Sequence, residues 1–181
     1  MKKAVKKEIK HIIKRFEFNC SIREFKNKAT WTKISIHHKL SEDFIREFKD
    51  YVKWNNLSQC QKLSEDFIRE FKDKLHWACI SEFQKLSEPF IREFKDELHW
   101  ANICRSQKLS ENFIKEFKDK VDWYVLTFYQ YPTFSKYFIY EFQDKLNMEY
   151  LIEEKIITEK ELKELEYKDR IKSRFDILDI R

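Results

Sequence analysis

Apolar and polar residues follow one pattern that returns every 23 residues along the middle of the chain. The residues from Leu63 to Trp77 read LSEDFIREFKDKLHW, and closely similar phrases begin at Leu40, Leu86 and Leu109. A short fixed period is typical of an array of stacked repeats rather than of a domain with a single core. We number the repeat from this leucine, which is repeat position 1.

The first half of each repeat predicts an amphipathic helix. A serine at repeat position 2, followed by an acidic residue, is typical of an N-cap. Pro89 falls in the first helical turn of its repeat, where a missing N–H is tolerated. The apolar residues fall on one arc of a helix, and in the first clear repeat they are Leu40, Phe44, Ile45, Phe48 and Val52.

Oppositely charged residues lie four apart on the polar face of this predicted helix. Such spacing favours ion pairs within the helix, each worth about 0.2 to 0.5 kcal/mol. The predicted pairs are Arg46–Asp50, Arg69–Asp73, Arg92–Asp96, Glu70–Lys74 and Glu116–Lys120.

The second half of each repeat predicts another, shorter helix over repeat positions 15 to 22. It begins with a tryptophan, and these account for every tryptophan in the protein: Trp31, Trp54, Trp77, Trp100 and Trp123. A large aromatic residue that recurs at one place in stacked repeats is typical of a core position. At repeat position 14 we expect Thr30, Asp122 and Asn147 to act as N-caps, but not Lys53, His76 or His99.

These patterns predict an all-α protein, a right-handed solenoid of stacked two-helix repeats that is elongated and curved. Repeats of this size cannot bury their apolar faces alone and must stack. Residues 1–16 form a basic N-terminal helix or cap, and 17–156 form the array, with units near 17, 40, 63, 86, 109 and 134. The unit at 134 follows a two-residue lengthening at Tyr131–Pro132. Residues 157–181 form a degenerate unit, opened by a capping box of Thr158 and Glu161, and a charged tail.

Composition narrows the possible chemistry. Glycine is absent, so the chain has no glycine-rich phosphate loop. No apolar run is long enough for a membrane helix and no signal peptide is visible, so we expect a cytoplasmic protein. Acidic residues recur in every repeat, whereas catalysis needs one pair made different by its surroundings. We therefore expect no enzyme activity and no cofactor.

The four cysteines occupy unrelated repeat positions, and we expect Cys20, Cys60, Cys79 and Cys104 to be free thiols. His76 and His99 share one repeat position, but Cys79 and Cys104 do not. Because zinc needs four converging ligands, we expect no metal site there.

Residues 1–16 carry seven lysines and arginines against one acid, a net charge of +6 in a chain of net charge +5. The spacing of their apolar residues favours a capping helix with a basic polar face. A contact with nucleic acid or another anionic surface is the alternative. The candidate anion contacts are Lys2, Lys3, Lys6, Lys7, Lys10, Lys14 and Arg15.

Repeat positions 16, 17, 20 and 21 differ from copy to copy on an otherwise constant frame. In a solenoid, such positions are where a binding surface is usually found, although drift at exposed positions explains the variation equally well. The candidate partner-binding residues are Asn55, Asn56, Gln59, Glu82, Phe83, Asn102, Arg105, Tyr124, Phe128 and Tyr129. With Tyr131, the last three form an aromatic end of this predicted face.

The phrase LSEDFIREFKDKL with its tryptophan, and the QKLSE that links one copy to the next, resembles short helical repeats in proteins of amoeba-infecting giant DNA viruses. The resemblance covers about residues 17–156 and implies a viral protein that engages a host or virion protein, without catalytic residues. The function hypothesis is a protein-binding or scaffold module with an unidentified partner. The alternatives are a nucleic-acid-associated protein that uses the basic N-terminus, and a structural component of a larger assembly.

Overall fold

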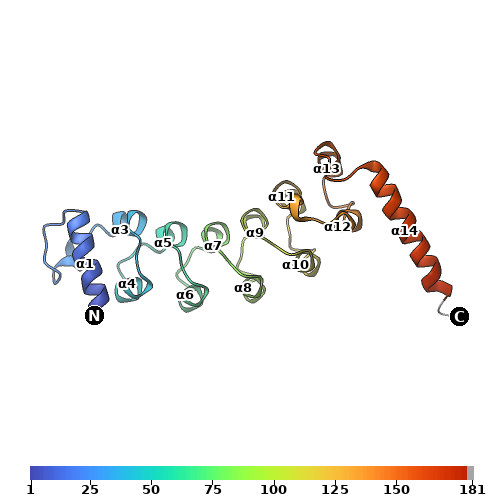
Figure 1. Ribbon diagram of the computed structural model, residues 1–181. Coiled ribbons are helices and arrows are strands. Elements are labelled where there is room, and N and C mark those ends of the chain that lie inside the picture. The colour runs from blue at the N-terminus through green and yellow to red at the C-terminus, as the bar shows by residue number, and fades with distance from the viewer. Residues whose placement is uncertain (179–181) are drawn as a thin grey trace. The chain divides into compact units, whose positions relative to one another are not determined.

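The computed structural model describes residues 1–178, and their side chains as far as Ile171. Residues 179–181, the end of the predicted charged tail, lie outside the described residues. Every regular element in the described part is a helix (Figure 1), and helix pairs recur at the 23-residue period, which confirms the predicted all-α helical-repeat solenoid. The chain divides into two compact units, Met1–His99 and Trp100–Arg181, and the boundary falls inside one sequence repeat.

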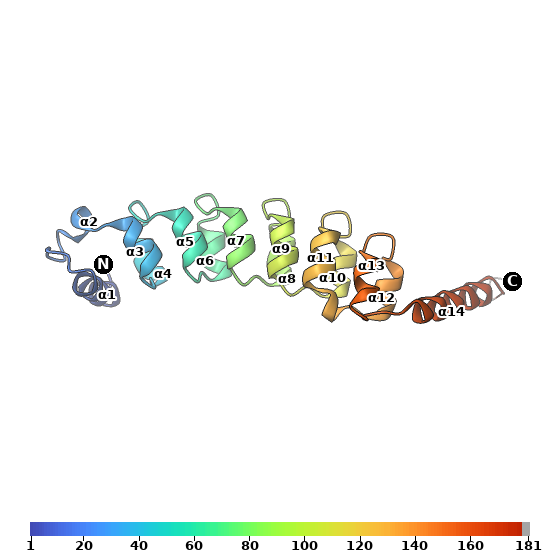
Figure 2. The same cartoon turned by 90° about the horizontal axis from the view of Figure 1, so that it is seen from above.

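The N-terminal unit contains eight helices. They are α1 (Lys3–Arg15), α2 (Phe25–Lys28), α3 (Trp31–His37), α4 (Glu42–Glu47), α5 (Trp54–Cys60), α6 (Glu65–Glu70), α7 (Trp77–Phe83) and α8 (Glu88–Glu93). First helices α4, α6 and α8 lie in one row and second helices α3, α5 and α7 in another (Figure 1). Within the second row, α3 packs against α5 and α5 against α7 (Figure 2).

The described part of the C-terminal unit continues the same alternation and ends in a long helix. Its elements are α9 (Trp100–Ser106), α10 (Glu111–Glu116), α11 (Trp123–Tyr129), the 3₁₀ helix η1 (Tyr131–Thr133), α12 (Lys136–Glu141), α13 (Met148–Glu153) and α14 (Glu159–Leu178). The predicted lengthening at Tyr131–Pro132 is η1. The predicted capping box also forms, with Thr158 and Glu161 exchanging bonds between backbone N–H and side chain.

The first helices begin where the serine predicts but end earlier than the apolar pattern predicts. Ser41 Oγ accepts the Phe44 N–H at 3.1 Å, and the equivalent serines cap α6, α8, α10 and α12. Helix α4 nevertheless ends at Glu47. Phe48 then opens one separate turn, in which its carbonyl accepts the Val52 N–H at 3.1 Å, so both side chains stay buried without a continuous helix.

The second helices start at the predicted tryptophan but differ from the prediction in length and capping. They span seven residues in α5 and six in α13, so they are not shorter than the six-residue first helices. Asp122 and Asn147 cap as expected. The prediction was wrong for Thr30, which makes no side-chain cap, and for His76, whose Nδ1 accepts the Cys79 N–H at 3.4 Å because imidazole nitrogen can also accept.

The tryptophans are half-buried rather than central in the core, which corrects the sequence prediction. The Trp54 ring lies 4.9 Å from that of Phe71 in the following repeat, and Trp54 Nε1 donates to the Lys49 carbonyl at 2.9 Å. The fully buried aromatic residue is instead the phenylalanine at repeat position 5, as in Phe44 and Phe67. An indole keeps its N–H beside a backbone carbonyl at the edge of the core, whereas the benzyl ring has no polar atom to satisfy.

A buried glutamine at repeat position 22 ties successive repeats together. Gln84 Nε2 donates to the carbonyls of Ser58 and Gln61 at 2.9 and 2.7 Å, and its Oε1 accepts the Leu63 N–H at 3.0 Å. Gln61 makes the corresponding three bonds one repeat earlier. The pattern returns in the C-terminal unit at Gln130. One amide thus satisfies two carbonyls of the preceding repeat and the N–H of the leucine that opens its own repeat.

A second link runs from repeat position 19 to the next second helix. Ser58 Oγ accepts the His76 N–H at 3.0 Å and donates to the Trp54 carbonyl. Thr127 makes the same pair of bonds, and buried Cys104 replaces the hydroxyl, its Sγ accepting the Asp122 N–H at 3.4 Å. Cys104 thus stands at the repeat position where Ser58 and Thr127 carry the hydroxyl, while the other three cysteines occupy other repeat positions, as the sequence indicates.

Ion pairs on the first-helix row form between repeats as well as within a helix, where Arg46 contacts Glu42 at 3.5 Å, but the predicted Arg46–Asp50 pair is replaced. Arg46 Nε contacts Glu70 of the next repeat at 2.7 Å, in place of Asp50. Asp50 contacts Lys74 at 3.8 Å. The pattern follows from the early end of each first helix, because Asp50 lies beyond Glu47 and no longer occupies the helical position that faces Arg46.

Helix α1 covers the first repeat at the N-terminal end of the array and makes the same contacts that a preceding first helix would make. Its apolar face, Val5, Ile9 and Ile12, is buried. Glu8 accepts both the N–H and the hydroxyl of Ser41, just as Glu42 accepts the Ser64 N–H at 2.8 Å.

Prediction for the glutamine link. Replacing Gln84 with Leu leaves two buried carbonyls and one buried N–H without their partner. Since each such group costs about 1 to 3 kcal/mol, we expect the free energy of unfolding to fall by at least about 2 kcal/mol. Urea unfolding followed by far-UV circular dichroism measures this. The matched control is Gln59→Leu, because Gln59 is exposed. Equal stability of the two variants would contradict the assigned role.

His38 occupies the glutamine position of the first unit and is buried with Nδ1 unbonded, as far as the described residues show. Its ring lies 5.6 Å from that of His11 on α1. Burial lowers the pKa of His38, and the charges of Arg15 and His11 lower it further, while Glu8 opposes them.

Prediction for pH. With its folded pKa below 6.5, His38 binds a proton more readily in the unfolded chain. Stability should be full above about pH 6.5 and fall as the pH drops below it. Glu24 and Glu161, whose pKa values are lowered to about 2, lose their contribution only at lower pH. We expect His38→Gln to flatten this decline in urea midpoints, and exposed His37→Gln to leave it intact. An unchanged decline in His38→Gln would refute the assignment.

Candidate partner-binding surface

The second helices of the N-terminal unit present their variable residues on one exposed side. Asn55 and Gln59 on α5 are exposed, and Phe83 on α7 is 48% exposed, unusually high for a phenylalanine. Asn56 and Glu82 are half-buried. Because α5 and α7 pack side by side, the structure brings these five candidates together.

The C-terminal unit carries the aromatic end of the predicted surface. Tyr124 and Tyr129 on α11 are 70% and 56% exposed, and Phe128 between them is half-buried. The Phe128 ring lies 4.7 Å from that of Tyr124 and 4.5 Å from that of Tyr150 on α13. The Tyr150 ring in turn meets Tyr131 of η1 edge to face at 5.6 Å. We call these five residues the aromatic surface.

Tyr150 is a member of the aromatic surface that the sequence did not single out. It stands at repeat position 17 of a decayed unit, where the other repeats have no aromatic residue, so only the structure reveals the contact. Partial burial raises the pKa of Tyr150, and a hydrogen bond and charge interaction with Tyr131 raise it further, with a contribution from the Glu154 carboxylate.

The remaining candidates lie on α9, which packs against α11. Arg105 is exposed, and its guanidinium carbon lies 5.5 Å from the centre of the Tyr129 ring. Asn102 is half-buried. Repeat position 17 is in general a packing position, because Val125 is buried there and Asn56, Cys79 and Asn102 are half-buried. Positions 16, 20 and 21 form most of the open surface.

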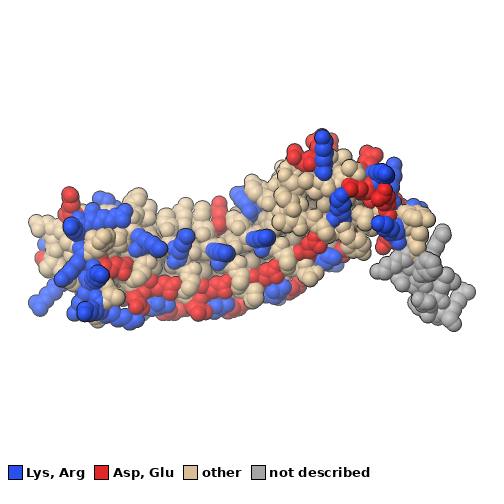
Figure 3. Space-filling view, viewed as in Figure 1, with Lys and Arg blue, Asp and Glu red and all other residues tan. Residues whose placement is uncertain are grey.

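The candidate anion contacts lie on or next to α1. Lys3, Lys6, Lys7 and Lys10 are exposed and, with Ala4 and Ile22, line a hollow of about 600 Å³. Figure 3 shows basic side chains gathered at this end of the N-terminal unit. Lys2 instead pairs with Asp43 at 2.7 Å, and Lys14 and Arg15 are exposed near the end of the helix. Four of the seven bases therefore share one open face.

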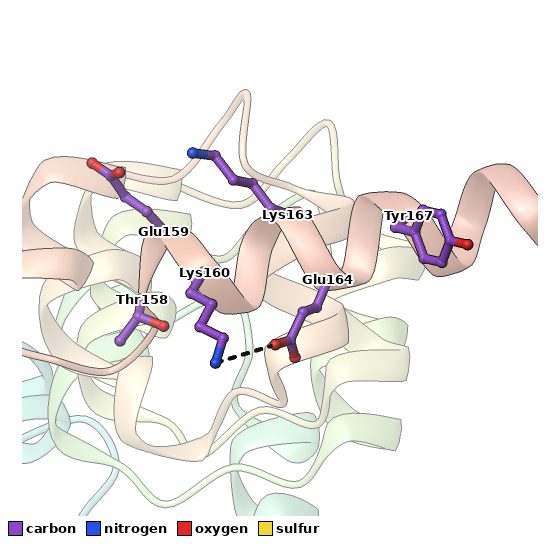
Figure 4. A pocket seen from close by; sticks show the side chains of 6 residues that line it. All are labelled: Thr158, Glu159, Lys160, Lys163, Glu164 and Tyr167. Atoms are coloured by element: carbon purple, nitrogen blue, oxygen red, sulfur yellow. Dashed lines mark ion pairs between the residues drawn. The ribbon is translucent and has the colours of Figure 1, made fainter.

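Another hollow, on α14, brings no reactive groups together. Its lining side chains come from Thr158 and one helix, and they point to different sides of that helix (Figure 4). Lys160 and Glu164 form an ion pair at 4.0 Å. Side chains that diverge from one helix, with an ordinary i,i+4 ion pair among them, lack the convergent groups of a binding site.

The cysteines and histidines show no metal-binding arrangement in the described residues, where no group of three or more potential metal ligands occurs. All four cysteines are free. Burial raises the pKa of Cys104 to about 11. Among the described helices, none is long and apolar enough to cross a membrane.

Comparisons with known proteins add no relative. No family model matches the chain, and no curated protein or solved structure matches it. The resemblance of the repeat to those of giant-virus proteins stays a prediction.

Proposed function

We propose that the protein is a non-enzymatic binding module that holds a partner protein against its second helices. The observation that carries the proposal is the aromatic surface, which leaves two tyrosines more than half exposed beside packed Phe128 and Tyr150. Exposed, clustered aromatic rings cost solubility and are enriched where proteins bind one another. Rings held against neighbouring rings also lose little conformational freedom on binding.

The structure of the repeat supports this use of the second helices. Buried glutamines and hydroxyls hold the backbone through repeat positions 19 and 22, and the first-helix row is occupied by ion pairs between repeats. Residues at positions 16, 20 and 21 take little part in this frame. A binding surface can therefore vary there without loss of the fold.

Prediction for the aromatic surface. Phe128→Ser combined with Tyr129→Ser should reduce partner retention at least about tenfold, the size expected for central aromatic contacts. Partners are captured from a lysate of the source organism on the intact protein, and helicity is checked by circular dichroism. The control is Tyr137→Ser on α12, a tyrosine that is 53% exposed but lies outside the aromatic surface. Retention of the same partner by the double variant, or its loss in the control, would refute the proposal.

The open face of α1 favours a second candidate function, contact with nucleic acid. Lys3, Lys6, Lys7 and Lys10 stand at i, i+3, i+4 and i+7, which aligns their ammonium groups along one side of a helix. Such a stripe can follow a phosphate backbone.

Prediction for the basic face. If α1 contacts nucleic acid, changing Lys6, Lys7 and Lys10 together to Gln should weaken binding of a labelled duplex DNA. The slope of the logarithm of the binding constant against the logarithm of salt concentration should also become shallower by about one for each lost phosphate contact. Lys39, Lys62 and Lys85, changed together to Gln, form a control with the same loss of charge in the same unit. Equal weakening in both variants would mean only nonspecific attraction.

A further inference from the structure

In several repeats a basic side chain lies over a phenylalanine ring of the next repeat and pairs with a glutamate of that repeat. The Arg46 guanidinium lies 5.0 Å from the Phe67 ring centre while its Nε contacts Glu70 at 2.7 Å. The next repeat has the same arrangement, with Arg69 5.0 Å from the Phe90 ring and 2.8 Å from Glu93. In the C-terminal unit Lys115 lies over Phe138 and pairs with Glu141. A ring with an adjacent carboxylate is thus a cation site in this molecule.

Within the aromatic surface, the one cation that the described residues place over a ring is Arg105, over Tyr129, while Phe128 and Tyr150 have rings with carboxylates nearby. Glu149, Glu153 and Glu154 are exposed on and just after α13, and none forms an ion pair within the described part of the chain. No basic group of the described residues lies over Phe128 or Tyr150 either. Rings and acids are therefore both available to a partner.

Helix geometry places the acids next to the rings. Glu153 and Glu154 follow Tyr150 by three and four residues, so all three share one helix face. The Glu154 charge is close enough to affect the ionisation of the Tyr150 hydroxyl. The bases nearby are few: Arg105 covers Tyr129 instead, and Lys155 follows in a left-handed backbone conformation with its side chain exposed.

We propose that the aromatic surface binds a basic segment of a partner protein, with an arginine or lysine over the Phe128 and Tyr150 rings and paired with Glu153 or Glu154. This inference rests on the proposed protein-binding function and names the chemistry of the partner. Cation–π attraction and the carboxylates act together at one place, as they do between the repeats. An acidic segment would meet three like charges, two on α13 and one just after it.

The test measures binding of a fluorescent peptide of alternating glycine and arginine to the full chain by anisotropy. The reference peptide has citrulline, a neutral residue of similar shape, at each arginine. Two variants address the surface: Glu153→Gln with Glu154→Gln, and Tyr150→Leu, which keeps an apolar side chain but removes the ring. The matched control is Asp119→Asn with Asp144→Asn, which removes two exposed acids elsewhere in the same unit.

We expect the arginine peptide to bind and the citrulline peptide to bind at least about tenfold more weakly. Each surface variant should weaken binding about threefold to tenfold, and the control less than about twofold. Equal binding of both peptides, equal weakening in the control, or no binding of the arginine peptide would overturn the inference. If partner capture still depended on Phe128 and Tyr129 in any of these cases, the protein-binding function would stand and only the basic partner would be lost.

Discussion

The buried glutamine side chain that joins each repeat to the preceding one is the interaction on which the described array depends. Helices of six or seven residues are too short to be stable alone, so they need contacts outside themselves. The link between a second helix and the next first helix leaves backbone carbonyls and an N–H inside the core. The Gln84 amide bonds to three of these groups at once, and Gln61 and Gln130 do the same in their repeats.

This frame explains why the two rows of helices differ in character. The first helices bury phenylalanine and isoleucine on one side and exchange ion pairs with neighbouring repeats on the other, so few of their positions can change freely. The second helices meet the frame through the hydroxyl and glutamine positions. The side chains at the outer positions of the second helices take no part in the hydroxyl and glutamine bonds. Tyr124 and Tyr129 stand at these outer positions, where other repeats have smaller or more polar residues.

The N-terminal helix α1 has one buried apolar face and one exposed basic face. Its apolar face and Glu8 cover the first repeat as a preceding repeat would, while Lys3, Lys6, Lys7 and Lys10 remain on the open side. The end of the array is also where a histidine replaces the glutamine. A glutamine amide offers two N–H donors and an acceptor oxygen, whereas a neutral imidazole offers one donor and one acceptor. His38 therefore cannot replace all three glutamine bonds, and its Nδ1 is unbonded in the described structure.

The sequence by itself determined the repeat, its helix pair and most helix starts, because serine caps and apolar spacing are local signals that recur in every copy. It also identified the variable positions, including Tyr124, Phe128 and Tyr129. Only the tertiary structure decided that Arg46 pairs with Glu70, that the tryptophans lie at the core's edge and that Tyr150 joins Phe128. Those outcomes depend on which repeats face each other and where each first helix stops. A constant glutamine in each internal copy was a visible signal, but its three backbone partners lie 21 to 26 residues earlier in the chain, and linear spacing does not show them.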